Sequence, residues 1–299
     1  MSERKLLFIF NPKSGTGLIK NHLVEIVDLM IKAGFDTTIY TTQEKGDATR
    51  KVVECGKSFD RIMCSGGDGT LDEVVTGMRQ IHLHVPLGYI PAGSTNDFAK
   101  SLGIPSDMVK ATEIAVGEKI FSCDVGQLND DTFVYIAGFG LFTEISYETS
   151  QEMKNIFGHA AYLLSAAQSL ASIPNHMMQI EVNGEVIEDR FIYGMITNSI
   201  SVGGFKGLTG KNIELDDGEF EVTLIKHPSN PLELNEIITY LTGLISDTNM
   251  VYCYKAKSIH IRSRERVPWT LDGEFGGEHW DVDIINQHRK IEILVKEDE

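Results

Sequence analysis

Asp68 lies in a glycine-rich turn, Gly66-Gly67-Asp68-Gly69-Thr70, whose residue types imply a specific chemistry. The turn joins an apolar run, residues 61–65 (RIMCS), to an amphipathic segment typical of a helix. Glycines at such a junction let backbone N–H groups approach a phosphate, and the start of the helix adds the positive end of its dipole. A carboxylate is out of place in a site that binds only anions, because it is itself negatively charged. Asp68 therefore indicates a phosphate bound together with a cation, as phosphoryl transfer requires.

The same turn predicts where the next helix starts. Thr70 and Glu73 have the spacing of a capping box, with Thr70 as the capping residue. We therefore expect Asp68 to lie in a solvent-facing turn before the helix, rather than on an apolar face.

Two further turns have the same strand–turn–helix form. Residues 5–10 (KLLFIF) end in Asn11-Pro12-Lys13-Ser14-Gly15, and residues 86–90 (PLGYI) lead into a turn with Ser94-Thr95-Asn96-Asp97. In an open α/β sheet such turns emerge at the carboxyl ends of the strands, where ligands bind. The first turn is neither a Walker A loop nor a dinucleotide fingerprint. Each turn alone fits ordinary loop chemistry, but together the three predict one site.

The order of the elements predicts two domains. Residues 1–117 alternate strand and helix, which predicts a doubly wound parallel sheet. Beyond residue 120 the pattern changes to hairpins, with Asn183-Gly184 between two alternating runs and helices expected at 149–172 and 231–245. We expect an α/β domain at 1–120 and an antiparallel β-sandwich at 121–299, whose last strand can return to the first domain.

Composition and charge limit the location and the partners. No apolar run approaches the ~20 residues that a membrane-spanning helix needs, and the opening segment is not a signal peptide, so we expect a cytoplasmic protein. The net charge of −16 argues against a nucleic-acid partner. Arg262, Arg264 and Arg266 alternate along an expected strand, which predicts one shared face. That face is either a lipid-headgroup patch or, more ordinarily, a solvated surface paired with carboxylates.

The motifs together resemble a known family. The Asn11–Gly15 turn, the Gly66–Thr70 turn and residues 91–99 (PAGSTNDFA) are similar to the diacylglycerol kinase catalytic domain, and the whole chain resembles the bacterial lipid kinases of that family. Gly158-x-x-x-Tyr162, residues 215–218 (LDDG) and residues 271–274 (LDGE) extend the resemblance. The Gly-Gly-Asp-Gly-Thr turn alone is shared with NAD kinases and phosphofructokinases, so it identifies only a superfamily.

The resemblance implies an ATP-dependent lipid kinase that uses Mg²⁺ and phosphorylates diacylglycerol to phosphatidic acid, in a lipid cleft completed by the sandwich. It implies peripheral, reversible membrane contact and leaves a homodimer open. Carried onto matching positions, the nucleotide contacts would be Asn11, Pro12, Lys13, Ser14, Gly15, Thr41, Gly66, Gly67, Asp68, Gly69, Thr70, Glu73, Ser94, Thr95 and Asn96. A magnesium ion would be held by Asp217 with the backbone carbonyls of Glu214 and Glu219, where a plain Asp-Asp-Gly hairpin turn is the alternative.

Four carboxylates are the predicted catalytic residues. Asp68 and Asp97 would position metal and water, as transfer of a phosphoryl group requires. Asp272 and Glu274 have i, i+2 spacing on an expected strand, which puts both on one face. We assign Glu274 as the base, with Asp272 sharing that role or holding a metal. The alternative is that residues 271–274 form only a turn.

Other functions remain open. The same fold could phosphorylate another lipid alcohol, such as a sphingoid base, ceramide or phosphatidylglycerol, or a sugar or nucleotide. A nucleotide-binding regulator without catalysis is the non-enzymatic alternative. The four carboxylates argue against a regulator, because a protein that only binds nucleotide has no use for them around a triphosphate.

Overall fold

A computed structural model describes residues 4–141, 170, 173–199 and 213–297. The chain divides into two compact units, and it passes from one to the other within strands β5 and β13. Unit 1 consists of residues 1–125 and 288–299, and unit 2 consists of residues 126–287.

Unit 1 contains a parallel sheet with strand order β2-β1-β3-β4, next to the end of β13. Its strands are β1 (Arg4–Phe10), β2 (Phe35–Thr41), β3 (Arg61–Gly66) and β4 (Leu87–Pro91). Residues 6–10 of β1 and all of β3 are buried, as expected for parallel strands covered on both faces. The predicted doubly wound parallel domain is confirmed.

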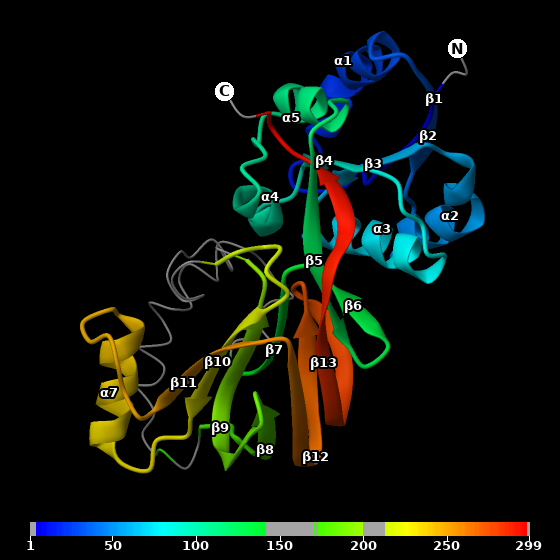
Figure 1. The fold of residues 1–299 in the computed structure, drawn as a ribbon. Helices are drawn as coiled ribbons and strands as arrows, with labels where there is room; N and C mark the ends of the chain where they lie inside the picture. The colour runs from blue at the N-terminus through cyan, green and yellow to red at the C-terminus, as the bar shows by residue number, and fades with distance from the viewer. Residues whose placement is uncertain (1–3, 142–169, 171–172, 200–212, 298–299) are drawn as a thin grey trace. The chain divides into compact units, whose positions relative to one another are not determined.

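Helices cover both faces of this sheet (Figure 1). They are α1 (Ile19–Lys32), α2 (Asp47–Cys55), η1 (Gly56–Ser58), α3 (Asp68–Gln80), α4 (Asp97–Ser101) and α5 (Met108–Ala115). α1 packs with α5, and α2 packs with α3. The polar turns between strands and helices therefore follow the carboxyl ends of β1, β3 and β4.

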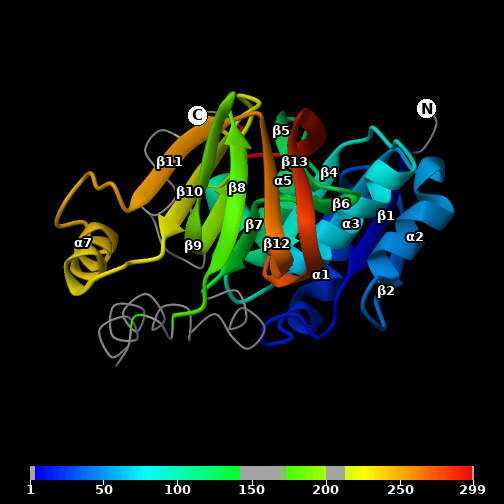
Figure 2. The same cartoon turned by 90° about the horizontal axis from the view of Figure 1, so that it is seen from below.

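Unit 2 is antiparallel, which confirms the predicted β-sandwich class (Figure 2). Its strands and helix are β5 (Ile120–Leu128, in part), β6 (Asp131–Phe133), β7 (Ile136–Gly140), β8 (His176–Val182), β9 (Glu185–Thr197), β10 (Phe220–Lys226), α7 (Pro231–Leu241), β11 (Val251–Ala256), β12 (Ser258–Leu271) and β13 (Glu274–Leu294). β9 and β12 each pair with β8 at one end and with β7 at the other. This closed circuit of strands surrounds a core that contains Phe139, Phe191 and Trp269.

Local signals explain two elements of unit 2. Asn183 and Gly184 have φ angles of 53° and 79°, the left-handed pair of a tight hairpin between β8 and β9, as predicted. The expected helix at 231–245 begins at Pro231, where the Asn230 side chain accepts bonds from the N–H groups of Leu232 and Glu233. The helix expected at 149–172, with Gly158 and Tyr162, lies outside the described residues apart from Leu170.

The three arginines of β12 fit the more ordinary of the two alternatives, a solvated surface paired with carboxylates. All three are exposed, although the β12–β13 register shifts between Arg262 and Val267. Arg262 pairs with Asp281 at 3.3 Å and Arg264 with Glu188 at 3.8 Å, while the Arg266 guanidinium lies over the Trp280 ring. A solvated surface with ion pairs describes these residues better than a uniform basic face.

In the described ranges, no helix is long and apolar enough to cross a bilayer.

Candidate active site

The structure brings the three polar turns of unit 1 together. The Asn11 N–H donates to the Ser65 carbonyl at 2.9 Å, and the Ala92 N–H donates to the Gly66 carbonyl at 2.7 Å. The Gly67 N–H also donates to the Ser14 Oγ at 3.3 Å. The turn after β3 is thus bonded to the turns on either side of it. This is the juxtaposition that the strand order predicts.

Two glycines are required by this close packing. Gly15 has a φ of 54°, and a Cβ there would lie 2.4 Å from the Ala92 carbonyl oxygen. A Cβ on Gly93 would lie 2.6 Å from the Gly67 Cα. Backbone meets backbone at both points, so no flexible side chain can move aside. The turns present main-chain groups at short range, as a phosphate site needs.

Asn96 holds its own turn. Its Oδ1 accepts from the Gly93 N–H and its Nδ2 donates to the Gly93 carbonyl, both at 2.9 Å. Asn96 is itself in the left-handed region, with a φ of 50°. Tyr89 on β4 links this region to the turn after β3, because its buried hydroxyl donates to the Gly66 carbonyl at 3.2 Å. Ser94, which precedes Asn96, is exposed, and Thr95 is half-buried.

Asp68 and Asp97 form a buried acidic pair. Asp68 is 8% exposed and Asp97 is 1% exposed, and the Asp97 N–H donates to the Asp68 Oδ2 at 3.2 Å. The Lys100 Nζ lies 3.3 Å from the Asp97 Oδ1. The expectation that Asp68 lies in a solvent-facing turn is wrong: it is the buried first residue of α3.

Burial sets the electrostatics of Asp68. Burial first, and the neighbouring Asp97 carboxylate second, raise the pKa of Asp68 to about 6. The Asp68 Oδ1 is buried and has no hydrogen-bond partner among the described residues. A buried carboxylate oxygen without a partner, beside glycine turns suited to phosphate, is a group that could hold a magnesium ion, which would neutralise phosphate charge there.

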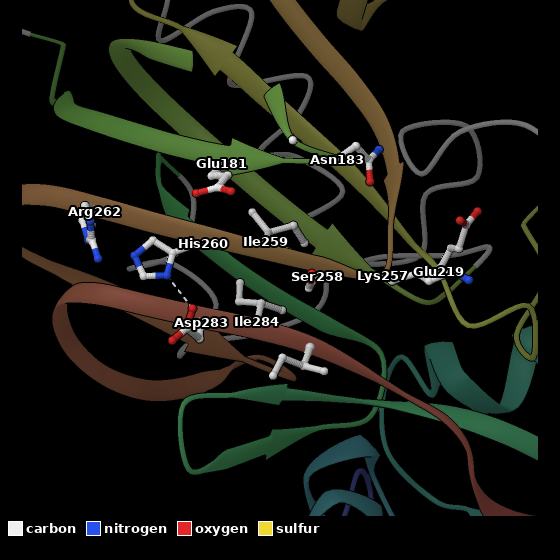
Figure 3. Close-up of a pocket in the computed structure, with 12 residues that line it drawn as sticks. Glu181, Asn183, Glu219, Lys257, Ser258, Ile259, His260, Arg262, Asp283 and Ile284 are labelled. Atoms are coloured by element: carbon white, nitrogen blue, oxygen red, sulfur yellow. Dashed lines mark hydrogen bonds and ion pairs between the residues drawn. The ribbon is translucent and has the colours of Figure 1, made fainter. Parts of the chain in front are cut away.

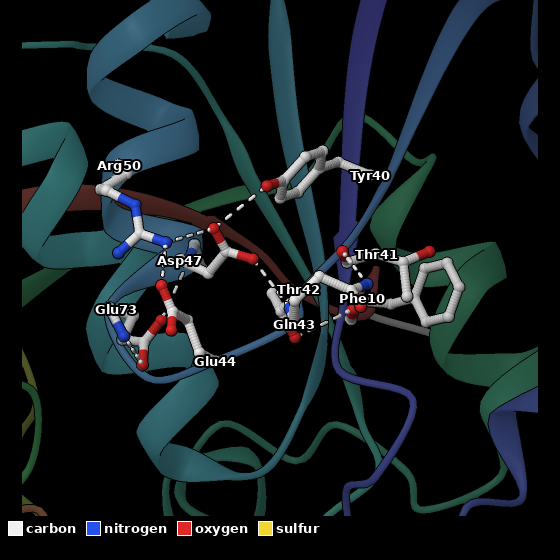
Figure 4. Close-up of polar contacts among 11 residues, drawn as sticks. Phe10, Tyr40, Thr41, Thr42, Gln43, Glu44, Asp47, Arg50 and Glu73 are labelled. Atoms are coloured by element: carbon white, nitrogen blue, oxygen red, sulfur yellow. Dashed lines mark hydrogen bonds and ion pairs between the residues drawn. The ribbon is translucent and has the colours of Figure 1, made fainter.

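The capping-box prediction is wrong. α3 begins at Asp68 with Gly67 as its N-cap, three residues before Thr70, the expected N-cap. Glu73 instead reaches across to α2, where its Oε1 accepts from the Gly46 N–H at 2.8 Å and its Oε2 from the Ala48 N–H at 3.1 Å. Glu73 therefore caps the neighbouring helix, and both of its oxygens are engaged (Figure 4).

Asp47 organises the segment that follows Thr41. The Asp47 carboxylate accepts from the Gln43 N–H at 2.7 Å and from the Tyr40 hydroxyl at 3.0 Å, and it pairs with Arg50 at 2.8 Å (Figure 4). The Gln43 N–H bond, the largest cause, and the bonds from Tyr40 and Arg50 lower the pKa of Asp47 despite burial. Sequence analysis missed this residue, although its partners are local: Arg50 follows it by three positions and Gln43 precedes it by four.

Asp272 lies in a turn, not on a strand, so the expected shared face with Glu274 is wrong. Leu271 pairs with Glu274 across a tight turn, with φ angles of 50° at Asp272 and 86° at Gly273. The turn alternative is therefore the correct conformation. Asp272 is 5% exposed, whereas Glu274, the first residue of β13, is exposed.

The Asp272 carboxylate is bonded to the chain before β7. It accepts from the N–H groups of Val134 at 2.5 Å, Tyr135 at 3.0 Å and Ile136 at 3.0 Å. The Asp272 N–H donates in turn to the Ile136 carbonyl at 2.9 Å. These bonds make Asp272 an anchor of the turn from which Glu274 projects.

The residues predicted to hold a second magnesium ion fit that role poorly. The Asp217 Oδ1 accepts from the Glu219 N–H, and its Oδ2 lies 2.9 Å from the Lys255 Nζ. An ammonium thus already neutralises the carboxylate. Within the described part of the chain, no group of three or more His, Cys, Asp or Glu side chains is placed to hold a metal.

A separate pocket of about 650 Å³ lies in unit 2 (Figure 3). His260 lines it between two carboxylates, 3.0 Å from the Asp281 Oδ1 and 2.5 Å from the Asp283 Oδ1. Of the predicted site residues only Glu219 lines this pocket. The pocket is thus distinct from the turns of unit 1.

Comparisons with known proteins agree with the geometry. A family model described as "Diacylglycerol kinase catalytic domain" matches residues 5–128, and one described as "YegS C-terminal NAD kinase beta sandwich-like domain" matches residues 140–286. The diacylglycerol kinase of Staphylococcus carnosus is 33% identical over 99% of this chain and 96% of its own length. That of Bacillus subtilis is 34% identical over 98% of this chain and 96% of its own length. The chain belongs to the bacterial diacylglycerol kinase family.

A solved structure from the same family has the same fold. A crystal structure of a diacylglycerol kinase from Bacillus anthracis superposes with a TM-score of 0.77 at 27% identity, over 99% of this chain and 98% of that one. The protein is therefore a lipid kinase with the two-part family architecture. Family membership implies ATP as the phosphate donor and a lipid as the acceptor.

The two family models divide the predicted site residues between them. The catalytic-domain model spans the three turns with Asp68 and Asp97, and the sandwich model spans Asp217, Asp272 and Glu274. The roles of the individual residues rest on the geometry described above, and they are proposals.

Proposed function

We propose that this lipid kinase transfers the γ-phosphate of ATP to the free hydroxyl of diacylglycerol and forms phosphatidic acid. The relatives named diacylglycerol kinase support this acceptor. The observation that carries the reaction type is the buried Asp68 Oδ1, which has no hydrogen-bond partner among the described residues and lies amid three turns joined by backbone bonds.

Each turn has a proposed part in binding ATP. Main-chain N–H groups of Gly15 and Gly69 and the hydroxyl of Ser14 would bind the phosphates, with Ser14 positioned by the bond that it accepts from the Gly67 N–H. Asp68 would hold Mg²⁺, which when bound neutralises phosphate charge. Asp97 and Lys100 fix the Asp68 carboxylate from the third turn, through the N–H bond to Asp68 and the Lys100–Asp97 ion pair.

The remaining predicted contacts are part of the same proposal. They are Asn11, Pro12, Lys13, Thr41, Gly66, Thr70, Glu73, Ser94, Thr95 and Asn96. Among these, Glu73 and Asn96 contribute indirectly, since their side chains hold backbone segments in place.

We assign Glu274 as the base that takes the proton of the lipid hydroxyl. It is an exposed carboxylate next to the Asp272–Gly273 turn. The Asp272 carboxylate, in contrast, is buried and accepts bonds from the N–H groups of Val134, Tyr135 and Ile136, which protonation would weaken. A positioned base typically contributes about 10²–10⁴-fold to the rate. Asp272 acts as a positioning residue.

The acceptor also implies where the enzyme works. A lipid with two acyl chains stays in the bilayer, so we propose that the enzyme works in the cytoplasm and contacts the membrane peripherally and reversibly. We leave a homodimer open, as the family resemblance does.

The test is transfer of label from γ-labelled ATP to a panel of lipids in mixed micelles. The panel contains diacylglycerol, a sphingoid base, ceramide and phosphatidylglycerol. We expect labelled phosphatidic acid at the highest kcat/KM, and no product with chelator present. Preferred labelling of another lipid would replace diacylglycerol as the acceptor, and labelling of none would contradict the proposal.

A further inference from the structure

A lysine lies between two carboxylates in unit 2. The Lys255 Nζ is 2.9 Å from the Asp217 Oδ2 and 3.4 Å from the Glu221 Oε1. Lys255 on β11 is the cross-strand partner of Glu221 on β10, and Asp217 belongs to the turn that leads into β10. The hydrogen-bond register of two strands therefore fixes the position of the ammonium.

Both carboxylates are largely withdrawn from water. The Asp217 side chain is 19% exposed and the Glu221 side chain is 8% exposed. Two carboxylates in so little water are strongly destabilising unless a positive charge compensates them. The ammonium of Lys255 supplies one charge and several donors at the point where both carboxylates converge.

The same place was predicted to hold a metal ion through Asp217 and the carbonyls of Glu214 and Glu219. A divalent ion bound to the Asp217 Oδ2 would share that oxygen with the ammonium, and the two cations would repel each other at short range. The Glu221 Oε2 is buried without a hydrogen-bond partner among the described residues, so a further oxygen ligand is at hand once the ammonium is removed.

We propose that Lys255 is a built-in cation that takes the place of a divalent metal ion between Asp217 and Glu221. In this chain the sandwich is then stable without metal at that turn. Removal of the ammonium converts the same residues into a site for a hard divalent cation, for which carboxylate and carbonyl oxygens are the preferred ligands.

The test is the thermal unfolding midpoint of the full chain, without nucleotide or lipid, in EDTA and in millimolar Mg²⁺ or Ca²⁺. We expect the midpoint of the unmodified protein to be the same in all three. Lys255→Met keeps the apolar stem and removes the charge. Its midpoint should fall in EDTA and rise by roughly 5 °C when either ion is added. The midpoint of Lys255→Arg should not change when either ion is added.

Two further variants show which residues cause the rise of the midpoint with metal. Adding Asp217→Asn to Lys255→Met should abolish the rise. Lys226→Met is the matched control, because Lys226 pairs with a single carboxylate, Asp189, at 2.8 Å on the same strand system. It should lose stability without gaining a response to metal.

Three results would overturn the proposal. One is an unmodified protein whose midpoint rises with Mg²⁺ or Ca²⁺ and no longer does so after Asp217→Asn. Another is a Lys255→Met protein that is as stable as its parent in EDTA. The last is a destabilised Lys255→Met protein, or one that fails to fold, that neither ion rescues during refolding. None of these readouts depends on kinase activity, so failure of this proposal can be distinguished from failure of the proposed function.

Discussion

The backbone N–H of Asp97 donates a hydrogen bond to the Asp68 Oδ2 at 3.2 Å, so the turn after β3 and the turn after β4 are joined through an acidic side chain. Both residues are almost fully buried. This bond uses one oxygen of Asp68 and leaves the other for a ligand. The fold thus keeps the Asp68 carboxylate buried. This lowers the stability of the folded protein, and such a perturbed carboxylate is typical of a functional site.

That cost predicts that Asp68→Asn is more stable than the parent protein at neutral pH. The pKa of Asp68 in the folded protein, about 6, lies above the ordinary value of 3.8, so ionisation of Asp68 destabilises the fold as the pH rises from 4 to 6. Above pH 6 the full penalty, about 3 kcal/mol, persists. Asp68→Asn should unfold at a higher temperature at pH 8 and at nearly the same temperature at pH 4, as measured by calorimetry without nucleotide.

The matched control is Asp36→Asn, an exposed aspartate on β2 of the same unit. Its unfolding should follow the parent protein at every pH. If Asp68→Asn were less stable than the parent protein at pH 8, Asp68 would be stabilised by its surroundings, and the electrostatic account would be wrong.

Gly15→Ala should damage the site far more than an ordinary glycine substitution does. Its Cβ would meet the Ala92 carbonyl oxygen at 2.4 Å, so the first and third turns must separate. Gly103 has a comparable φ of 69° with nothing within 4 Å, so Gly103→Ala carries only the backbone strain, about 1 kcal/mol. Isothermal titration should show at least about tenfold weaker ATP binding for Gly15→Ala only. Equal affinities would mean that the close approach of the two turns does not matter for ATP.

Glu73→Gln tests whether Glu73 caps α2. A glutamine offers one acceptor oxygen instead of two, and bonds from backbone N–H groups to a charged acceptor contribute about 1.5–3 kcal/mol. The free energy of unfolding should therefore fall by about 1–2 kcal/mol, and amide exchange at Gly46 and Ala48 should quicken. Glu113→Gln, an exposed glutamate on α5, is the control. Unchanged exchange at Gly46 and Ala48 would show that the cap is unimportant.

Much of this was predictable from sequence, for physical reasons. Apolar runs such as residues 5–10 predict buried parallel strands, and the strand order then brings their polar turns together without any knowledge of side-chain contacts. The helix start at Asp68 was missed because Thr70 and Glu73 match a local capping pattern, whereas the Glu73 side chain bonds to Gly46 and Ala48, 27 and 25 residues away in the chain.

Long-range partners explain the other errors. Asp272 bonds to N–H groups 136–138 residues away, so its anchoring role leaves no local signal next to Gly273 and Glu274. Lys255 meets Asp217 only because β10 and β11 pair. Sequence spacing showed the carboxylates, but only the fold shows their partners.

Asp272→Asn and Glu274→Gln should therefore have different effects: the first should lower stability, and the second should lower the rate of the reaction. Asparagine places an NH₂ group among three N–H donors, so Asp272→Asn should lower the free energy of unfolding by about 2–4 kcal/mol. Glu274→Gln should leave stability unchanged and lower kcat by about 10²–10⁴-fold at an unchanged KM for ATP. Unfolding curves and steady-state kinetics on both variants check this. A stable but inactive Asp272→Asn beside an active Glu274→Gln would make Asp272 the base.

Transfer of label from γ-labelled ATP to diacylglycerol by the unmodified protein and by Asp68→Asn tests the central claim most directly. The account predicts labelled phosphatidic acid from the unmodified protein and a rate at least about 10²-fold lower from Asp68→Asn, since the charge that holds the metal is lost while the fold is retained. Label transfer at the same rate by both proteins would contradict the assignment of Asp68, and no transfer to lipid by the unmodified protein would contradict the function.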